Sequence, residues 1–300
     1  MTDIENAHEL LYYELTKELE QLCERYHFAR LGSAGKSVLG KELLTLNIGN
    51  GKESVLMCGA FHGTERLTAT LLLIFAERLC EALSHDGSIA GIRARRAFFD
   101  RRLVILPMVN PDGCDIVGEG TTNCGRFADS VNRISAGEFN KWNANVRGVD
   151  INHNFDAGWK ILHSLEQKAN IYGPSPTRYG GSRPVSEPET AAMVELCEKE
   201  RFCHVAAFHS QGEIIYWSYG DATPEKGKRM ATLMSASSGY ALEEPTEIAS
   251  HGGFKDWFIE KYRRPGFTVE IGRGTNPLPA NQFRLIYPRV EEMMMLLCIL

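Results

Sequence analysis

The chain has 300 residues, of which 43% are hydrophobic and 24% are charged, a composition typical of globular proteins. Its formal net charge of −5 gives no electrostatic reason to expect a nucleic acid partner. No apolar run is long enough to cross a bilayer, and the N-terminus lacks the charged and apolar segments of a secretory signal. The eight cysteines include no Cys-x-x-Cys pair, which argues against a zinc ribbon and fits reduced thiols. We therefore expect a cytoplasmic protein without a membrane or nucleic acid partner, and the oligomeric state is not indicated.

Apolar strands alternate with helical stretches along the chain. Leucines between charged residues predict an amphipathic helix over about residues 7–26, followed by a turn at 31–35 and a strand at 41–48. Asn50-Gly51 predicts a hairpin turn into the apolar strand that ends at Gly59, and residues 65–83 are helical in pattern. The remaining predicted elements are strands at 103–106, 205–208, 214–217 and 267–270, helices at 186–201, 225–240 and 282–300, and an irregular segment at 118–142. Because no linker-like composition divides the chain, we expect a single α/β domain over residues 1–300, with the N-terminal helix packed on it.

Three of the predicted strands end in side chains that can bind or assist a zinc ion. His62 and Glu65 follow the strand ending at Gly59, His209 follows the strand at 205–208, and Glu270 ends the strand at 267–270. On one sheet these strand ends can converge at the same edge, where ligands bind in open α/β folds. Two imidazoles and a carboxylate, with one further carboxylate free, match the composition of a catalytic zinc site. Asp150 is a candidate to hydrogen-bond a ligand imidazole, or alternatively a turn or capping residue.

The His-x-x-Glu spacing is a weak signal when taken alone. His163-Ser164-Leu165-Glu166 has the same spacing, but it lies in an amphipathic stretch with no apolar strand before it. We interpret this second copy as the solvated face of a helix.

Five motifs in order resemble those of the zinc metallocarboxypeptidase family. They are His62-Gly63-Thr64-Glu65, Asn110-Pro111-Asp112-Gly113, Gly148-Val149-Asp150-Ile151-Asn152, His209-Ser210 and Phe267-Thr268-Val269-Glu270. The resemblance implies a three-layer α/β/α sandwich around a mixed sheet of about eight strands. It also implies one Zn2+ ion bound by His62, Glu65 and His209, with Glu270 as the catalytic carboxylate and Asp150 behind a ligand imidazole.

The chain departs from the family pattern where the family binds substrate. Family members usually follow the Asn equivalent to Asn152 with an Arg that helps to clamp a substrate C-terminal carboxylate, and here that position is His153. Imidazole does not replace the bidentate fork of Arg, which weighs against plain C-terminal exopeptidase specificity. The family's oxyanion-stabilising Arg commonly follows a Trp, but Trp142 is followed by Asn143. Lys141, Asn143 and Arg147 remain as alternative substitutes for it.

Three further strings resemble one branch of the family, the γ-D-glutamyl-meso-diaminopimelate peptidases and murein peptide amidases. They are His209-Ser210-Gln211-Gly212-Glu213, Gly252-Gly253-Phe254-Lys255-Asp256-Trp257, and Glu270-Ile271-Gly272-Arg273-Gly274 with Asn276-Pro277-Leu278-Pro279. This resemblance implies a bacterial peptidase that recycles cell-wall peptides, with a small peptide as its substrate. Arg273 could pair with a substrate carboxylate or stabilise a turn. A zinc carboxypeptidase or N-acyl-amino-acid deacylase of other specificity, and a non-catalytic peptide-binding relative, remain as alternatives.

Overall fold

The structure, a computed structural model, describes residues 4–244 and 250–300. Its main feature is an eight-stranded sheet with strand order β1-β2-β6-β3-β7-β10-β8-β9. The strands are β1 (Ala29–Lys36), β2 (Glu42–Ile48), β3 (Glu53–Gly59), β6 (Arg101–Leu106), β7 (His204–Ser210), β8 (Ile214–Tyr216), β9 (Ala241–Glu243) and β10 (Gly266–Ile271). The central strands β6, β3, β7 and β10 are mutually parallel, whereas β1, β2 and β8 form antiparallel pairs. The sheet is therefore mixed, and its parallel centre has one carboxyl edge.

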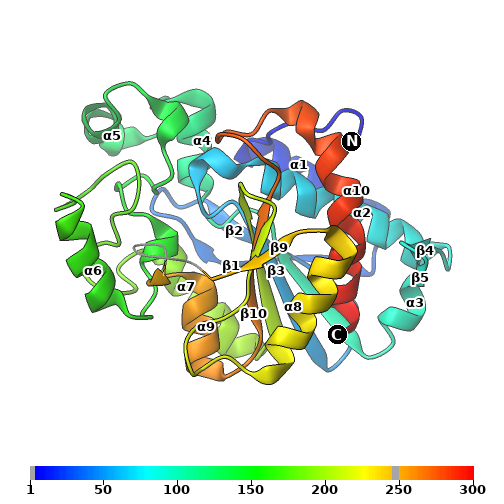
Figure 1. Cartoon of the computed structure of the whole chain (residues 1–300). Helices are drawn as coiled ribbons and strands as arrows, with labels where there is room; N and C mark the ends of the chain where they lie inside the picture. The colour runs from blue at the N-terminus through cyan, green and yellow to red at the C-terminus, as the bar shows by residue number, and fades with distance from the viewer. Residues whose placement is uncertain (1–3, 245–249) are drawn as a thin grey trace.

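Helices cover both faces of this sheet (Figure 1). One face packs against α1 (Tyr12–Arg25), α2 (Leu67–Ser84), α8 (Glu225–Ser238) and α10 (Phe283–Ile299), and the other against α7 (Pro188–Glu200) and α9 (Phe254–Tyr262). The shorter elements are β4 (Ser88–Ile89), β5 (Ile92–Arg93), α3 (Ala94–Ala97), α4 (Pro111–Glu119), α5 (Ala128–Ser135) and α6 (Trp159–Lys168). This arrangement confirms the predicted three-layer α/β/α sandwich around a mixed sheet.

The alternation of side chains along β3 explains why its sequence is a continuous apolar run. Val55 and Met57 lie in the core on the α2 side, whereas Leu56 and Cys58 lie in the core on the α7 side. Successive residues of a strand point to opposite faces, so a strand covered on both faces needs apolar residues at every position. Such a strand holds its carboxyl end in place, which matters because His62 lies three residues after the last residue of β3.

Three local predictions are wrong. Asn50-Gly51 does not form a hairpin, because β6 lies between β2 and β3 in the sheet. Instead Gly51 lets the chain pass the start of β6, since a Cβ atom there would lie 2.0 Å from the carbonyl carbon of Asp100. The turn expected at 31–35 is part of β1, which pairs antiparallel with β2 at the sheet edge. The irregular segment expected at 118–142 contains α5.

The helix expected over about residues 7–26 is α1, which spans Tyr12–Arg25 and buries Leu15, Leu19 and Leu22. Over the described part of the chain, no helix combines the length and the apolar character that crossing a membrane requires.

Candidate metal centre

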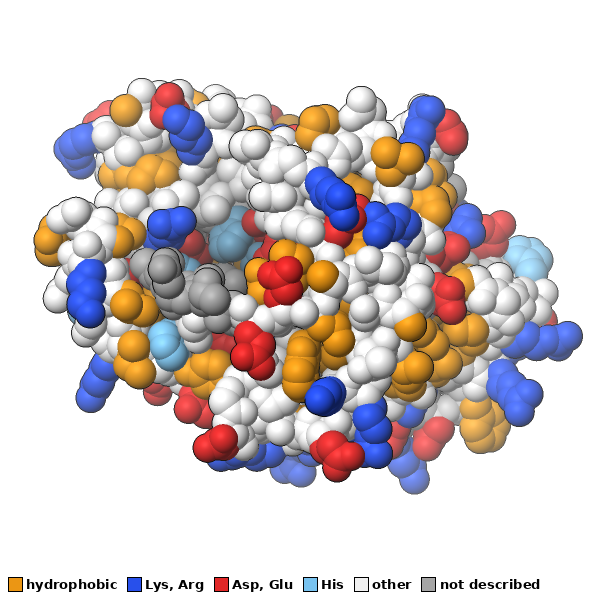
Figure 2. Space-filling model, in the orientation of Figure 1, with side chains coloured by type: hydrophobic (Ala, Val, Ile, Leu, Met, Phe, Trp, Pro, Cys, Tyr) orange, Lys and Arg blue, Asp and Glu red, His pale blue; other side chains and the backbone are white. Residues whose placement is uncertain are grey.

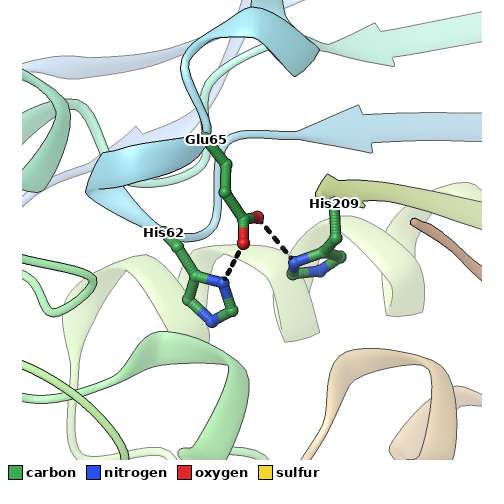
Figure 3. Close-up of side chains that lie close together, drawn as sticks. All are labelled: His62, Glu65 and His209. Atoms are coloured by element: carbon green, nitrogen blue, oxygen red, sulfur yellow. Dashed lines mark hydrogen bonds and ion pairs between the residues drawn. The ribbon is translucent and has the colours of Figure 1, made fainter. Parts of the chain in front are cut away.

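Three side chains from two strand ends converge at the carboxyl edge of the sheet (Figure 3). His62 precedes a short 3-10 helix, η1 (Gly63–Glu65), that follows β3, and His209 lies near the end of β7. The carboxylate of Glu65 lies between the two imidazoles. Its Oε1 is 2.9 Å from Nδ1 of His62, and its Oε2 is 3.0 Å from Nδ1 of His209. One ligand atom from each residue lies within 4.8 Å of the others, close enough for all three to bind one metal ion.

The turn that carries His62 and Glu65 depends on a glycine between them. A Cβ atom on Gly63 would lie 2.4 Å from the carbonyl oxygen of Gly113 and 2.5 Å from that of Trp142. Only glycine allows backbone to approach backbone this closely. The buried side chain of Asn110, at the start of α4, also donates to the carbonyl oxygen of Phe61 at 3.0 Å. The segment Asn110-Pro111-Asp112-Gly113 forms the start of helix α4 and is not a loop. From there it supports the turn that carries His62 and Glu65.

Asp150 orients the ring of His62 from the side opposite Glu65. Its Oδ1 lies 3.2 Å from Nε2 of His62, and its Oδ2 accepts a hydrogen bond from the backbone N–H of Arg178 at 2.9 Å. Burial opposes ionisation here, but the charges of His62 and His153 lower the pKa of Asp150 below its usual range. The ionised Asp150 accepts a hydrogen bond from the N–H at Nε2, which leaves Nδ1 of His62 available to a metal.

The donor set and its charge fit a zinc ion. Burial alone would raise the pKa of Glu65, but the imidazoles of His62 and His209 lower it to about 2, so the carboxylate stays ionised. Two imidazole nitrogens and a carboxylate are ordinary zinc ligands, and three protein ligands leave a coordination position open for water. Both ring nitrogens of His62 face carboxylate oxygens, so a cation at Nδ1 replaces a proton that His62 otherwise has to carry there.

The ring of His209 is held by only a few contacts. Its Nε2 atom is buried and has no hydrogen-bond partner among residues 4–244 and 250–300. Phe61 stacks against the imidazole with ring centroids 5.1 Å apart and planes 21° apart. The orientation of His209 therefore depends on this stacking, on Glu65 and on the neighbouring ring of His62, whose centroid lies 4.9 Å away.

Glu270 lies beside the proposed ligands on the neighbouring strand. β10 pairs with β7 in parallel, and the register places Glu270 directly opposite His209. Burial and the negative charge of Glu65 raise the pKa of Glu270 well above its usual range, although His62 opposes the shift. Two carboxyl groups in one site thus have pKa values shifted in opposite directions, a pattern that separates an ionised group from one that can hold a proton.

A pocket of about 140 Å³ opens next to these residues. Its lining consists of His62, Asn152, His153, His209, Tyr216, Gly253, Lys255, Asp256, Thr268 and Glu270. Figure 2 shows histidine side chains recessed in a hollow on one face of the molecule. Because two candidate metal ligands, Glu270 and charged groups share one small pocket, the site has the size and polarity to hold a polar substrate.

Two charged residues of this pocket, Lys255 and Asp256, were not assigned a role from the sequence. Their side chains are 4% and 3% exposed and form an ion pair with each other. Lys255 also donates to the carbonyl oxygen of Ser218 at 2.7 Å. Adjacent opposite charges within the otherwise apolar string Phe254–Trp257 were the available signal, because charged residues are rarely buried without a role.

A comparison of the whole sequence with known families decides the identity. Residues 13–294 match the zinc carboxypeptidase family. The chain belongs to this family. Because the family depends on zinc and the structure brings together a His-Glu-His group, the protein is a zinc peptidase. The resemblance predicted from five short motifs is thereby confirmed across most of the chain.

The chain is similar to a curated relative and to several solved structures. This zinc carboxypeptidase homologue is 36% identical over 280 residues to gamma-D-glutamyl-L-diamino acid endopeptidase 1 of Lysinibacillus sphaericus, which covers 92% of this chain and 69% of the relative. Bovine thrombin-activatable fibrinolysis inhibitor shares the fold with a TM-score of 0.75 at 17% identity, over 98% of this chain and 97% of that one. Murein-tripeptide amidase MpaA from Escherichia coli O157 gives a TM-score of 0.55 at 20% identity, over 88% and 91% of the two chains.

The five residues predicted to bind substrate occupy different places in this zinc peptidase. Asn152 and His153 line the pocket. The side chain of Asn152 accepts a hydrogen bond from the backbone of Phe254 at 3.0 Å, and Nδ1 of His153 lies 3.0 Å from the carbonyl oxygen of Arg178. Both side chains thus link the pocket wall to neighbouring loops.

The other three predicted residues, Asn143, Arg147 and Arg273, engage protein partners outside the pocket lining. Asn143 accepts a hydrogen bond at 2.6 Å, and the two arginines form ion pairs at 3.5 Å and 2.7 Å. Their partners are Thr64, Glu187 and Glu213, respectively. Asn143 therefore contacts the turn between the proposed zinc ligands, and each arginine is paired with a glutamate.

The second His-x-x-Glu copy, in α6, differs from its predicted solvated face. Glu166 is fully buried, and its Oε1 accepts a hydrogen bond from the backbone N–H of Gly180 at 2.7 Å. Nδ1 of His163 lies 3.2 Å from Glu166. No third ligand joins this pair within the described ranges, where His62, Glu65 and His209 form the one group suited to a metal. The pair anchors the loop around Gly180.

Proposed function

We propose that this protein hydrolyses the bond between γ-D-glutamate and meso-diaminopimelate in cell-wall peptides, with zinc bound by His62, Glu65 and His209. The charged pair in the pocket carries this proposal, and the relative named as a gamma-D-glutamyl-L-diamino acid endopeptidase supports it. The convergence of three donor atoms within 4.8 Å supports the ligand assignment.

The chemistry divides between the metal and the chain's own carboxyl groups. When bound, zinc supplies a Lewis acid that lowers the pKa of a water and polarises the scissile carbonyl. Glu270 accepts the proton of the attacking water and returns it to the nitrogen of the leaving amine. A raised pKa suits this shuttle, because proton transfer is most efficient when the pKa lies near the working pH. Asp150 keeps Nδ1 of His62 directed at the metal.

The substrate class follows from the charges of the pocket. The side chain of diaminopimelate ends in an ammonium and a carboxylate on the same carbon, and Lys255 and Asp256 present one charge of each sign. The substrate carboxylate can pair with Lys255 while its ammonium pairs with Asp256. An apolar side chain in the same pocket would contact both protein charges without pairing with either, which disfavours it relative to a side chain that pairs with both.

The test is a substrate panel assayed with added zinc. The panel contains L-Ala-γ-D-Glu-meso-diaminopimelate, the same tripeptide with lysine in place of diaminopimelate, an ordinary C-terminal peptide and an N-acyl-amino acid. Mass analysis should detect free diaminopimelate from the first substrate. Preferred cleavage of the ordinary peptide or the acyl-amino acid would refute the proposal in favour of another zinc hydrolase. Binding of the tripeptide without any cleavage would instead indicate a non-catalytic relative.

A charge-neutral variant tests the role of the pocket separately. The double substitution Lys255→Met with Asp256→Asn removes both charges together, so neither group remains buried without its partner. The unchanged protein should prefer diaminopimelate over lysine, which lacks the distal carboxylate, by at least about tenfold, in line with one lost charged hydrogen bond. The double variant should lose this preference. A preference that survives in the variant would exclude the pair as its source.

A further inference from the structure

Asn276 lies on the segment that follows β10, and its side-chain amide reaches two parts of the metal centre. Its Nδ2 atom donates to Oε1 of Glu65 at 3.3 Å and to the carbonyl oxygen of Ser210 at 2.7 Å. Its Oδ1 atom accepts a hydrogen bond from the hydroxyl of Ser210 at 2.9 Å. Ser210 directly follows His209 at the end of β7. The amide thus contacts one proposed zinc ligand and the chain neighbour of another.

We propose that Asn276 is a positioning residue for the metal, which holds the carboxylate of Glu65 in the orientation that binds zinc. This inference rests on the proposed ligand set. The two oxygens of Glu65 are not equivalent: Oε1 faces His62 and Asn276, whereas Oε2 faces His209. A donor on Oε1 restricts the rotation of the carboxylate about its last bond. The carboxylate of Glu65 then loses less conformational entropy when the metal binds, which increases the affinity for the metal.

The contacts of Asn276 require an amide at this position. One Nδ2 atom supplies both donors, to Glu65 and to the Ser210 backbone, while Oδ1 accepts from the Ser210 hydroxyl. An aspartate offers only acceptors and would place a second carboxylate against Glu65. A serine or alanine is too short to bridge the two elements. The three hydrogen bonds also fix Asn276 itself, so its donor is held in place before the metal arrives.

The experiment measures zinc affinity, not turnover. Metal-free protein and its Asn276→Ala variant are titrated with zinc in competition with a chromophoric chelator. Partners of metal ligands typically contribute about 10–100-fold to metal affinity, so the Kd for zinc should rise by that factor in the variant. Thr275→Ala is the matched control, because Thr275 is the exposed neighbour on the same segment, and its Kd should equal that of the unchanged protein.

A second readout separates positioning from a structural role. The melting temperature of the metal-free protein is compared among the same variants. A Kd raised by about 10–100-fold in Asn276→Ala with an unchanged melting temperature supports positioning. A Kd within about threefold of the unchanged value, or a raised Kd together with a lower melting temperature, overturns the inference. If Asn276→Ala does not fold, Asn276→Ser gives the same test, because its hydroxyl remains near Ser210 but does not reach Glu65.

The ligand set itself is tested by His209→Ala, which should lose zinc. If the unchanged protein binds zinc and His209→Ala does not, an unaltered Kd in Asn276→Ala refutes only the role of Asn276. If His209→Ala binds zinc as tightly as the unchanged protein, the ligand set fails, and the inference about Asn276 fails with it.

Discussion

Replacing Glu270 by glutamine separates catalysis from metal binding. The amide has nearly the same size as the carboxyl group but cannot accept the proton of the attacking water. General acid-base catalysis contributes about 10²–10⁴-fold, so kcat should fall by about that factor, which corresponds to about 3–5 kcal/mol of transition-state stabilisation. Glu270 is not among the three donors that converge within 4.8 Å, so the variant should still bind one zinc ion.

The same substitution has a stability signature in the metal-free protein. Because burial and Glu65 raise the pKa of Glu270, its stabilising contribution is complete below the unfolded pKa and is lost as the pH rises through the folded pKa. Glutamine does not titrate, so the variant should lack this loss at higher pH. The measurements are steady-state kinetics, zinc content by atomic absorption, and thermal unfolding of the metal-free proteins at several pH values. Unchanged turnover in the zinc-loaded variant would refute the assignment of Glu270.

Three further predictions follow from individual contacts. His209→Ala removes one of three proposed zinc ligands, so the affinity for zinc should fall by more than the factor of about 10–100 that is typical of removing a partner of a ligand. His163→Ala should leave the zinc content unchanged. An equal loss of zinc in both variants would contradict the choice of site. Burial lowers the pKa of His204 to about 4, so the unfolded chain binds the proton first and the free energy of unfolding should fall by about 3 kcal/mol as the pH drops from about 6.5 to 4. Urea titrations across this pH range should show a smaller fall in the free energy of unfolding for His204→Gln than for the unchanged protein. An equal fall in both proteins would show that His204 is not the group responsible. Gly63→Ala places a Cβ atom 2.4 Å from the oxygen of Gly113 and should cost about 1–3 kcal/mol of stability as well as zinc affinity, measured by calorimetry of the metal-free and metal-loaded forms. A variant with normal zinc affinity would show that the turn can shift without moving its ligands.

The position of the candidate site could be predicted because its residues end apolar strands. β3, β7 and β10 are neighbours in the sheet and run in the same direction, so their carboxyl ends lie together. The sequence marks where each strand ends, since a polar residue that terminates an apolar run is a local signal. It does not reveal strand order, and β7 pairs with β3 although His204 and Val55 are far apart in the chain. The sequence could therefore suggest that His62, His209 and Glu270 converge, and the pairing of β7 with both β3 and β10 is what brings them together.

The failed hairpin shows why local turn signals mislead in such a fold. Asn50-Gly51 has the composition of a hairpin turn, but β6 pairs with both β2 and β3 and separates them. The glycine is needed because the backbone of Gly51 packs against residues 100–101.

Lys255 and Asp256 were missed for a related reason. Which face of α9 borders the pocket depends on how the helix packs on β7 and β10, and this packing is not encoded in the helix sequence alone.

The charges of the centre explain why a metal and a proton donor can share one site. Glu65 and Asp150 are both ionised, and without a metal the protonated imidazole of His62 lies between them and offsets one of the two negative charges. A divalent cation held by His62, Glu65 and His209 would take the place of that proton and would add a second positive charge beside Glu65. This extra charge offsets the repulsion between Glu65 and Glu270, which together with burial raises the pKa of Glu270. Metal binding would therefore lower the pKa of Glu270 relative to the metal-free protein, which favours the ionised carboxylate that accepts the proton of the attacking water.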